Sequence, residues 1–189
     1  MKIDAYPAQE PHSEGMAAYH RHLMALAEGL NGHEAQYGTD PYQSIVVFPA
    51  EKPSGKVLLF FHGGGWTNGY KEWMAFMAPA LNKLGITFAT AGYRLAPQHL
   101  FPAGLDDCAT ALAWLAGNVA RFGGDPARIF VGGHSAGGHY ASLLSVNESK
   151  RAPGQGALIR GCAPVSGVYY FGDDSGMAVR PRFLGAPEL

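Results

Sequence analysis

Residues 129–138 read IFVGGHSAGG, and they contain the pentapeptide that decides how this chain folds. The apolar run before Gly133 predicts a buried strand, and the stretch after Ser135 is compatible with a helix. A G-x-S-x-G pentapeptide in this context forms a sharp turn that strains the serine backbone and exposes its hydroxyl. Gly133 and Gly137 supply the small residues that such a turn needs. Ser135 is therefore the candidate catalytic nucleophile. The alternative is a glycine-rich loop that merely contains a serine.

The composition is that of an ordinary globular protein. The chain has 189 residues and a formal net charge of −1, which predicts one domain (residues 1–189) and gives no electrostatic sign of nucleic acid or anionic membrane. It begins without an apolar signal region and contains no run long enough to span a bilayer, so we expect a cytoplasmic protein with no membrane partner. Cys108 and Cys162 lie in apolar segments and are expected to be buried free thiols.

Apolar patterns that suit strands and helices alternate along the chain. The predicted strands are 44–48, 57–61, 86–91, 128–131 and 158–165, and the predicted helices are 14–30, 72–84, 103–122 and 136–146. The run at 57–61 is continuously apolar, which is typical of a strand buried on both faces of a parallel sheet. This alternation predicts an α/β fold with a mostly parallel central sheet flanked by helices.

A second glycine motif, HGGGW at residues 62–66, directly follows a predicted strand. Acyl transfer needs hydrogen-bond donors aimed at the oxygen that becomes negative, and consecutive glycines let backbone N–H groups approach that oxygen. We therefore assign Gly64 and Gly65 to an oxyanion hole, together with Ala136, the residue after the nucleophile. The ring of His62 is expected to brace this backbone. The alternative is a plain glycine turn between a strand and a helix.

These motifs and three others occur in a characteristic order: HGGGW, YRLAP (93–97), FPAGLDD (101–107), FGGDP (122–126) and GHSAGG (133–138). Together they resemble the α/β-hydrolase superfamily, and more narrowly the hormone-sensitive-lipase-like carboxylesterases and the related arylformamidases (kynurenine formamidases). The match covers residues 37–168. The sequence YGTDP at 37–41 and the tryptophan of HGGGW favour the arylformamidase branch, whereas YRLAP and FPAGLDD favour the esterase branch. Both branches stay open.

The resemblance implies an α/β-hydrolase fold and a serine hydrolase that cleaves a small carboxylic ester or aryl formamide through an acyl-enzyme on Ser135. It implies no organic cofactor, and no cluster of histidine, cysteine and aspartate has the spacing of metal ligands. The expected partner is a small-molecule ester or amide, and a homo-oligomer stays open. Residues 1–35 are either a helical lid over the site or a simple packing helix.

The resemblance also implies a triad acid and a triad histidine after the nucleophile. His139 is the only later histidine, and it lies on the same predicted helix as Ser135, so we expect a helix histidine rather than a base. His134 is expected to pack beside the nucleophile. Asp173 and Asp174 are expected in a solvated turn, because no histidine is there for them to orient.

We therefore expect that the C-terminal strands of the fold are missing from this chain, and that a second polypeptide supplies them with the triad acid and histidine. The alternative is a truncated or non-catalytic α/β-hydrolase-fold protein that binds rather than reacts.

Two further points concern side chains whose role the sequence leaves open. Asp106 and Asp107 are explained by the N-terminus of the predicted helix 103–122, which favours negative charge. Five large residues either line an apolar substrate pocket or belong to the core: Trp66, Tyr70, Trp73, Met74 and Met77.

Overall fold

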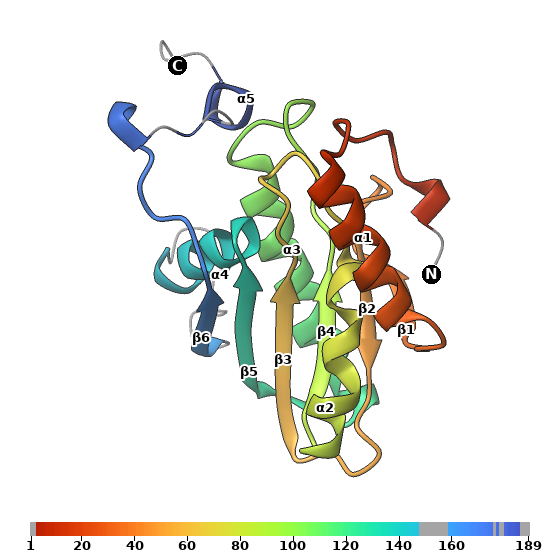
Figure 1. Cartoon of the computed structure of the whole chain (residues 1–189). Coiled ribbons are helices and arrows are strands. Elements are labelled where there is room, and N and C mark those ends of the chain that lie inside the picture. Colours follow the sequence, from red (N-terminus) through yellow and green to blue (C-terminus); the bar gives the residue numbers. More distant parts are fainter. Residues whose placement is uncertain (1–2, 148–158, 176, 178–179, 186–189) are drawn as a thin grey trace.

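The computed structural model describes residues 3–147, 159–175, 177 and 180–185, which form a six-stranded sheet with helices on both faces (Figure 1). The strands lie in the order β1-β2-β4-β3-β5-β6. Their bounds are β1 (His33–Gln36), β2 (Ser44–Phe48), β3 (Gly55–Phe61), β4 (Thr87–Ala91), β5 (Gly124–His134) and β6 (Ile159–Val165). The helices are α1 (Glu14–Ala27), α2 (Ala78–Lys83), α3 (Ala103–Asn118), α4 (Ala136–Val146) and α5 (Arg180–Leu184). Short 3₁₀ helices complete the set: η1 (Ile3–Ala5), η2 (Lys71–Met77), η3 (Val119–Phe122) and η5 (Asp173–Ser175).

The prediction of a mostly parallel sheet is confirmed. Strands β4, β3, β5 and β6 run parallel to one another, and only β2 and β1 are added antiparallel at one edge. The sequence analysis did not predict β1, because three of its four residues, HEAQ, are polar and exposed and show no apolar alternation. The structure therefore adds one strand to the five that the sequence predicted.

Side chains of the central strands alternate between two separate cores, as the period of two along a strand requires. Ile45 and Val47 of β2 face a core covered by α3 and α4, which also contains Ile129 and Val131 of β5. Val46 of β2 and Phe60 of β3 face the other core, which α1 and η2 cover; its buried members are Leu23, Ala27, Val46, Phe48, Phe60, Trp73, Met74, Ala75, Ala78 and Phe88. In Figure 1, α1 and α2 cover this second face over the strands on the β2 side, whereas none of the described helices covers β5 and β6 there.

Two predicted helices are shorter or differently wound than the apolar spacing suggested. The segment predicted as one helix, 72–84, is a 3₁₀ turn followed by α2, and proline stands in the first turn of α2, where its missing N–H costs nothing. The predicted helix 103–122 is α3 followed by η3, which ends at Gly123 with φ of 76°. The strand predicted at 158–165 is β6, whose predicted first residue, 158, lies outside the described residues.

A pair of charged side chains is buried beneath the start of the chain. Lys71 is 1% exposed, and its Nζ lies 2.7 Å from Oε1 of Glu34 and 2.7 Å from Oε1 of the fully buried Glu72. The Lys71 ammonium also donates to the Tyr6 hydroxyl. That hydroxyl in turn donates to Glu72 Oε1 at 3.0 Å, and burial and the Glu72 carboxylate raise the pKa of Tyr6 to about 12. This buried charge cluster joins η2, β1 and the N-terminal residues.

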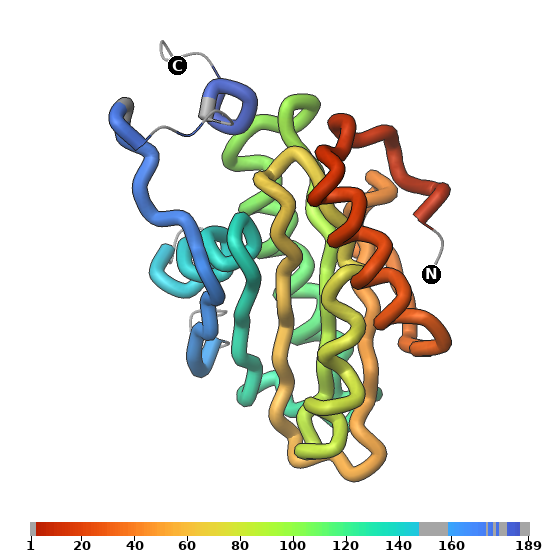
Figure 2. Tube along the Cα trace, viewed as in Figure 1, coloured from red at the N-terminus to blue at the C-terminus, as the bar shows by residue number. Residues whose placement is uncertain are grey.

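Both chain ends that the structure describes come to the same end of the sheet. Figure 2 shows α5 beyond the carboxyl end of β5, and the residues before α1 on the β2 side of the molecule. Cys108 is buried as expected, whereas Cys162 on the edge strand is only half-buried, and both are free thiols. Within the described ranges, no helix is long and apolar enough to cross a membrane.

Candidate active site

Ser135 lies in the turn between β5 and α4, and its backbone has φ of 52° and ψ of −115°. A positive φ is a sparsely populated conformation for a serine and costs about 1–3 kcal/mol, so the surrounding structure must hold it. One such restraint is the Ser135 amide, which donates to the carbonyl oxygen of Val165 in β6 at 2.8 Å. Another is the His139 amide, which donates to the carbonyl oxygen of Ser135 at 3.0 Å. The strained turn predicted from the pentapeptide is present.

The two flanking glycines are required because main chain fills the space where a side chain would be. A Cβ on Gly133 would lie 2.3 Å from the carbonyl carbon of Gly137. A Cβ on Gly137 would lie 2.2 Å from the carbonyl oxygen of Phe61 and 2.4 Å from that of His62. These contacts bring the end of β3 against the start of α4. The serine turn and the glycine motif that follows β3 are therefore packed together through their backbones.

The glycine loop, defined as residues 62–69, approaches Ser135 through Gly63. A Cβ on Gly63 would lie 3.2 Å from the Cβ of Ser135 and 3.0 Å from the carbonyl oxygen of His134. Gly64 and Gly65, the predicted oxyanion donors, have φ of 128° and 63°, conformations that glycine adopts readily. The sequence analysis did not single out Gly63, because three consecutive glycines carry no signal of which one faces the serine.

Gly64 and Gly65 also line an open groove of about 340 Å³. Its other walls come from residues 10–13 before α1, from Met16, Thr67 and Asn68, and from Arg182 of α5. Arg182 is paired with Glu10, with 2.6 Å between Nη1 and Oε2. Ser135 does not line this groove, which therefore adjoins the glycine loop without including the candidate nucleophile.

The ring of His62 is buried behind the glycine loop. Its Nδ1 donates to the carbonyl oxygen of Gly63 at 2.7 Å, and the ring stacks on Tyr93 with centroids 4.3 Å apart. The Tyr93 hydroxyl donates to the carbonyl oxygen of His62 at 2.7 Å. Burial lowers the pKa of His62 to about 4, so the ring is neutral at physiological pH. These contacts are those of a histidine that braces the loop backbone.

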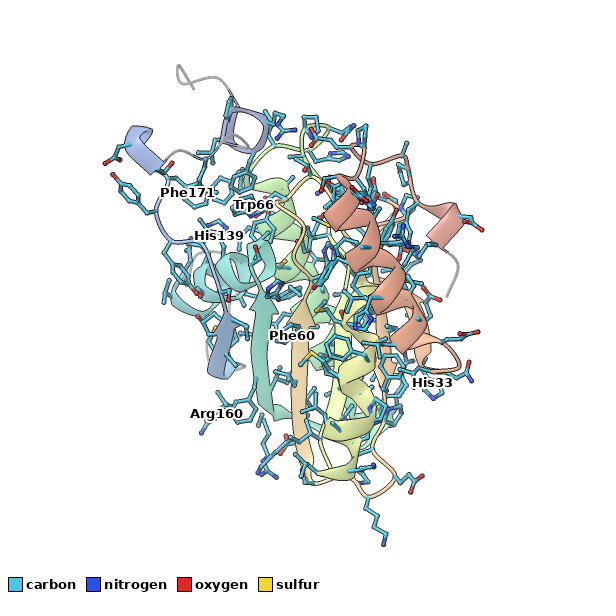
Figure 3. The ribbon with its side chains drawn as sticks, viewed as in Figure 1. His33, Phe60, Trp66, His139, Arg160 and Phe171 are labelled. Atoms are coloured by element: carbon cyan, nitrogen blue, oxygen red, sulfur yellow. The ribbon has the colours of Figure 1, made fainter. Side chains whose placement is uncertain are left out.

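His139 lies in a cluster of aromatic rings beyond the end of β5, beside Trp66 and Phe171 (Figure 3). Its Nδ1 accepts a hydrogen bond from Trp66 Nε1 at 3.3 Å, and the side chain is 6% exposed. Burial lowers the pKa of His139 to about 4. Within the part of the chain that the structure describes, no hydrogen bond joins the Ser135 hydroxyl to this or any other histidine.

The large side chains near the glycine loop belong mainly to the core. Trp66, Trp73 and Met74 are buried, with Trp66 stacked on Phe183 of α5 at 4.4 Å and Trp73 donating from Nε1 to His20 Nδ1 at 3.0 Å. Trp66 belongs to the core under α3 and α4, whereas Tyr70 and Met77 are half-buried and pack against the other core, beside Trp73 and Met74. The apolar-pocket alternative is therefore wrong for the first three, because their surfaces are occupied by neighbouring side chains.

Asp107 requires a correction. The helix N-terminus was expected to explain this carboxylate, but Asp107 is buried and accepts two hydrogen bonds from the Arg94 guanidinium, at 2.9 Å from Nε and 2.8 Å from Nη2. It also accepts from the Arg94 amide at 2.8 Å and from Gln43 Nε2 at 2.8 Å. The YRLAP and FPAGLDD motifs are thus joined by a bidentate ion pair, a contact between distant residues that helix patterns do not reveal. Asp174, in contrast, is exposed at η5, as expected for a solvated turn.

Acid should destabilise the protein through His139. Burial lowers its pKa from 6.5 to about 4, so between these values the unfolded chain binds a proton that the folded chain does not. The free energy of unfolding therefore falls as pH drops through this window; His139 contributes about 3 kcal/mol of the fall, and His62, whose pKa is also lowered to about 4, adds its own contribution. Urea unfolding of His139→Asn, which keeps an acceptor for Trp66, should show a smaller fall than the unmodified protein. His22→Asn, at an exposed position of α1, should show the same fall as the unmodified protein. Equal falls in the unmodified protein and His139→Asn would contradict the assignment.

The fold and the turn define a class of protein. A serine at positive φ, at the carboxyl end of a central parallel strand and packed against a glycine loop from the neighbouring strand, is the arrangement of an α/β hydrolase. A family model described as alpha/beta hydrolase fold matches residues 58–180. The chain belongs to this family, which confirms the resemblance drawn from the motifs.

Individual relatives agree with the family. The chain is 32% identical over 157 residues to the carboxylesterase NlhH of Mycobacterium tuberculosis, covering 77% of this chain and 49% of that protein. A solved bacterial heroin esterase is 30% identical with a TM-score of 0.62, covering 76% of this chain and 47% of that one. EstE1, a thermophilic carboxylesterase from a metagenomic library, superposes with a TM-score of 0.69 at 22% identity over 100% of this chain and 70% of that one, a likeness of fold alone. The chain spans about half the length of NlhH and of the heroin esterase.

Proposed function

We propose that this chain is the nucleophile-bearing part of a carboxylesterase-type serine hydrolase. The observation that carries the proposal is the backbone of Ser135, held at φ of 52° against Gly63 of the glycine loop. A serine in an ordinary loop has no physical need for a strained conformation that flanking main-chain contacts enforce. The relative named as a carboxylesterase, NlhH, supports the same class of reaction.

In the proposed mechanism, Ser135 Oγ attacks the carbonyl carbon of the ester while a histidine takes the hydroxyl proton. The N–H groups of Gly64, Gly65 and Ala136 would donate to the oxygen that becomes negative in the tetrahedral intermediate. Collapse of that intermediate releases the alcohol, protonated by the histidine, and leaves an acyl group on Ser135. Water, deprotonated by the same histidine, then releases the acid.

The triad histidine and acid would come from strands that pair with β6. Among the described residues, β6 is the last strand of the sheet on its side, and its residues 163–165 are exposed. Large apolar side chains near this edge are exposed to solvent: Phe130 of β5, the strand that pairs with β6, is 37% exposed, and Tyr169 and Tyr170, which follow β6, are each 61% exposed. An unpaired edge beside apolar surface is a site where further strands add. We propose that a second polypeptide supplies these strands with the histidine and the acid.

An aryl formamide is the second candidate substrate. The chemistry is the same up to the leaving group, because the nucleophile attacks a carbonyl carbon and the oxyanion forms in the same place. YGTDP at residues 37–41 favours this branch, and the structure places Tyr37 close to the motif residues: its hydroxyl donates to the carbonyl oxygen of Gly92 at 2.6 Å. Hydrolysis of N-formyl aniline and of p-nitrophenyl acetate by the same preparation would rank the two substrate classes.

The test uses the protein purified under native conditions together with any polypeptide that remains bound. A fluorophosphonate probe should label Ser135, and Ser135→Ala should lower p-nitrophenyl acetate hydrolysis on the order of 10³-fold or more. Ser145→Ala, a serine on helix α4, which follows Ser135, should keep both labelling and activity. A folded sample that leaves Ser135 unlabelled, or a Ser135→Ala variant with unchanged hydrolysis, would favour a non-catalytic binding protein instead.

Native mass spectrometry of the same sample tests the partner. The expected result is a complex of this chain with a second polypeptide, and separation of the two should abolish hydrolysis. Full activity of this chain by itself would contradict the proposal that the histidine and acid come from another polypeptide.

A further inference from the structure

The residues before α1 contact the last residues of the glycine loop, Asn68 and Gly69. We call residues 6–13 the N-terminal strap. Gln9 makes its main contacts: its Nε2 donates to the carbonyl oxygen of Gly69 at 2.8 Å, and its Oε1 accepts from the Gly69 amide at 2.8 Å. One side chain thus satisfies both backbone groups of one loop residue. Next to it, Asn68 Nδ2 donates to the carbonyl oxygen of Glu10 at 2.7 Å.

Gly69 is in direct contact with the first residues of the same loop, His62 and Gly63. It has φ of 117°, and a Cβ there would lie 2.3 Å from the carbonyl oxygen of Gly63 and 2.3 Å from Nδ1 of His62. Gly64 is equally close to Asn68, since a Cβ on Gly64 would lie 2.0 Å from the Asn68 carbonyl oxygen. The beginning of the loop (residues 62–64) and its end (residues 68 and 69) are therefore closely packed against each other. A displacement of Gly69 toward Gly63 must therefore displace Gly63 or Gly64.

We propose that Gln9 is a positioning residue for the glycine loop: it fixes Gly69, which fixes Gly63 against Ser135 and sets where the Gly64 and Gly65 N–H groups point. The path from Gln9 through Gly69 and Gly63 to Ser135 is contiguous, and each step is a hydrogen bond or a backbone contact. The catalytic consequence rests on the proposed function, in which those N–H groups receive the developing negative charge. The reaction rate depends strongly on the position of the loop, because donors misplaced by about 1 Å can lower the rate on the order of 10²-fold.

The strap is held independently of Gln9, which makes the residue testable. On one side, Tyr6 stacks on Tyr42 with centroids 4.8 Å apart and bonds the buried Glu72. On the other side, Glu10 pairs with Arg182 at 2.6 Å. Gln9→Ala therefore leaves the strap anchored at both ends and removes only the hydrogen bonds to Gly69 and the one to the Tyr42 hydroxyl, at 2.9 Å.

Hydrogen exchange of the full protein, with any bound polypeptide, measures the positioning directly. In Gln9→Ala the amides of residues 62–69 should exchange about tenfold faster, with the Gly69 amide changed most. Gln9→Glu keeps an acceptor for the Gly69 amide but sets a carboxylate oxygen against the Gly69 carbonyl oxygen, so exchange at that amide should be slower than in Gln9→Ala but faster than in the unmodified protein. Gln36→Ala, a glutamine exposed on β1, should leave residues 62–69 unchanged. Unchanged exchange of residues 62–69 in a folded Gln9→Ala protein would overturn the proposal.

Kinetics then separates positioning from simple structural support. Gln9→Ala should lower kcat for p-nitrophenyl acetate about tenfold or more with KM changed less than about threefold, because the donors act on the transition state. Faster exchange with an unchanged kcat would overturn the positioning role. If the unmodified protein and Ser135→Ala show the same absence of hydrolysis, the proposed function fails, and the exchange measurement alone decides whether Gln9 fixes the loop.

Discussion

Gly137→Ala is expected to destabilise the protein by about 4 kcal/mol or more, enough to remove much of the stability of a typical domain. A Cβ at this position would lie 2.2 Å from the Phe61 carbonyl oxygen, 2.4 Å from the His62 carbonyl oxygen and 2.6 Å from the Phe61 carbonyl carbon. All three atoms are backbone, so no side chain can rotate away to make room. Relief requires α4 to separate from the end of β3, and that separation would also disturb Ser135. A thermal unfolding experiment should show a melting temperature lower by about 8–16 °C.

Gly117→Ala is the matched control. Gly117 lies in α3, and a Cβ there would meet nothing within 4 Å. Alanine is the better helix former by about 1 kcal/mol, so this variant should be as stable as the unmodified protein or slightly more stable. If Gly137→Ala and Gly117→Ala melt within about 2 °C of each other, the backbone contact between α4 and β3 does not constrain the turn as described.

Lys71→Met is expected to cost about 3–5 kcal/mol, because it leaves a buried carboxylate without its counter-charge. Glu72 is 0% exposed on its side chain, and without Lys71 its remaining partner in the cluster is the Tyr6 hydroxyl. Glu34 loses the same ammonium but is 44% exposed and can be solvated. The cost therefore comes mainly from Glu72. Chemical denaturation should show a lower midpoint with an unchanged dependence on denaturant concentration.

The double variant Lys71→Met with Glu72→Gln tests that attribution. A neutral amide removes the uncompensated charge, so the double variant should recover more than half of the stability that the single variant loses. Lys56→Met, an exposed lysine on β3, should change the free energy of unfolding by less than about 0.5 kcal/mol. A double variant no more stable than Lys71→Met would mean that lost packing, rather than the buried charge, sets the cost.

Those parts of the fold with strong local patterns could be predicted from the sequence. Strand β2 and helix α4 have the predicted bounds, since one is a continuous apolar run and the other begins at the serine turn. The turn itself was predictable because its two glycines are needed by contacts within the pentapeptide and its neighbouring strand. Strand β1 was missed, because three exposed polar residues and one alanine at the edge of the sheet have no pattern of their own and form a strand only by pairing with β2.

The candidate site was predictable only where a motif carries its own geometry. Ser135 and the glycine loop are of this kind. The contacts of Gln9 with Gly69 and of Asp107 with Arg94 are not, because they join segments 60 and 13 residues apart whose residue types are common at any surface. Likewise, the sequence does not show which of the three glycines packs against Ser135, and the structure identifies it as Gly63.

The backbone angle of Ser135 has an evolutionary consequence. A glycine would adopt φ of 52° at lower energy, yet it would have no hydroxyl to offer. Selection for a more durable protein and selection for reactivity therefore pull in opposite directions at this one position. In a homologue that has lost the reaction, serine would keep the strained backbone without any catalytic benefit. Glycine at this position is therefore expected to appear early in homologues that are no longer enzymes.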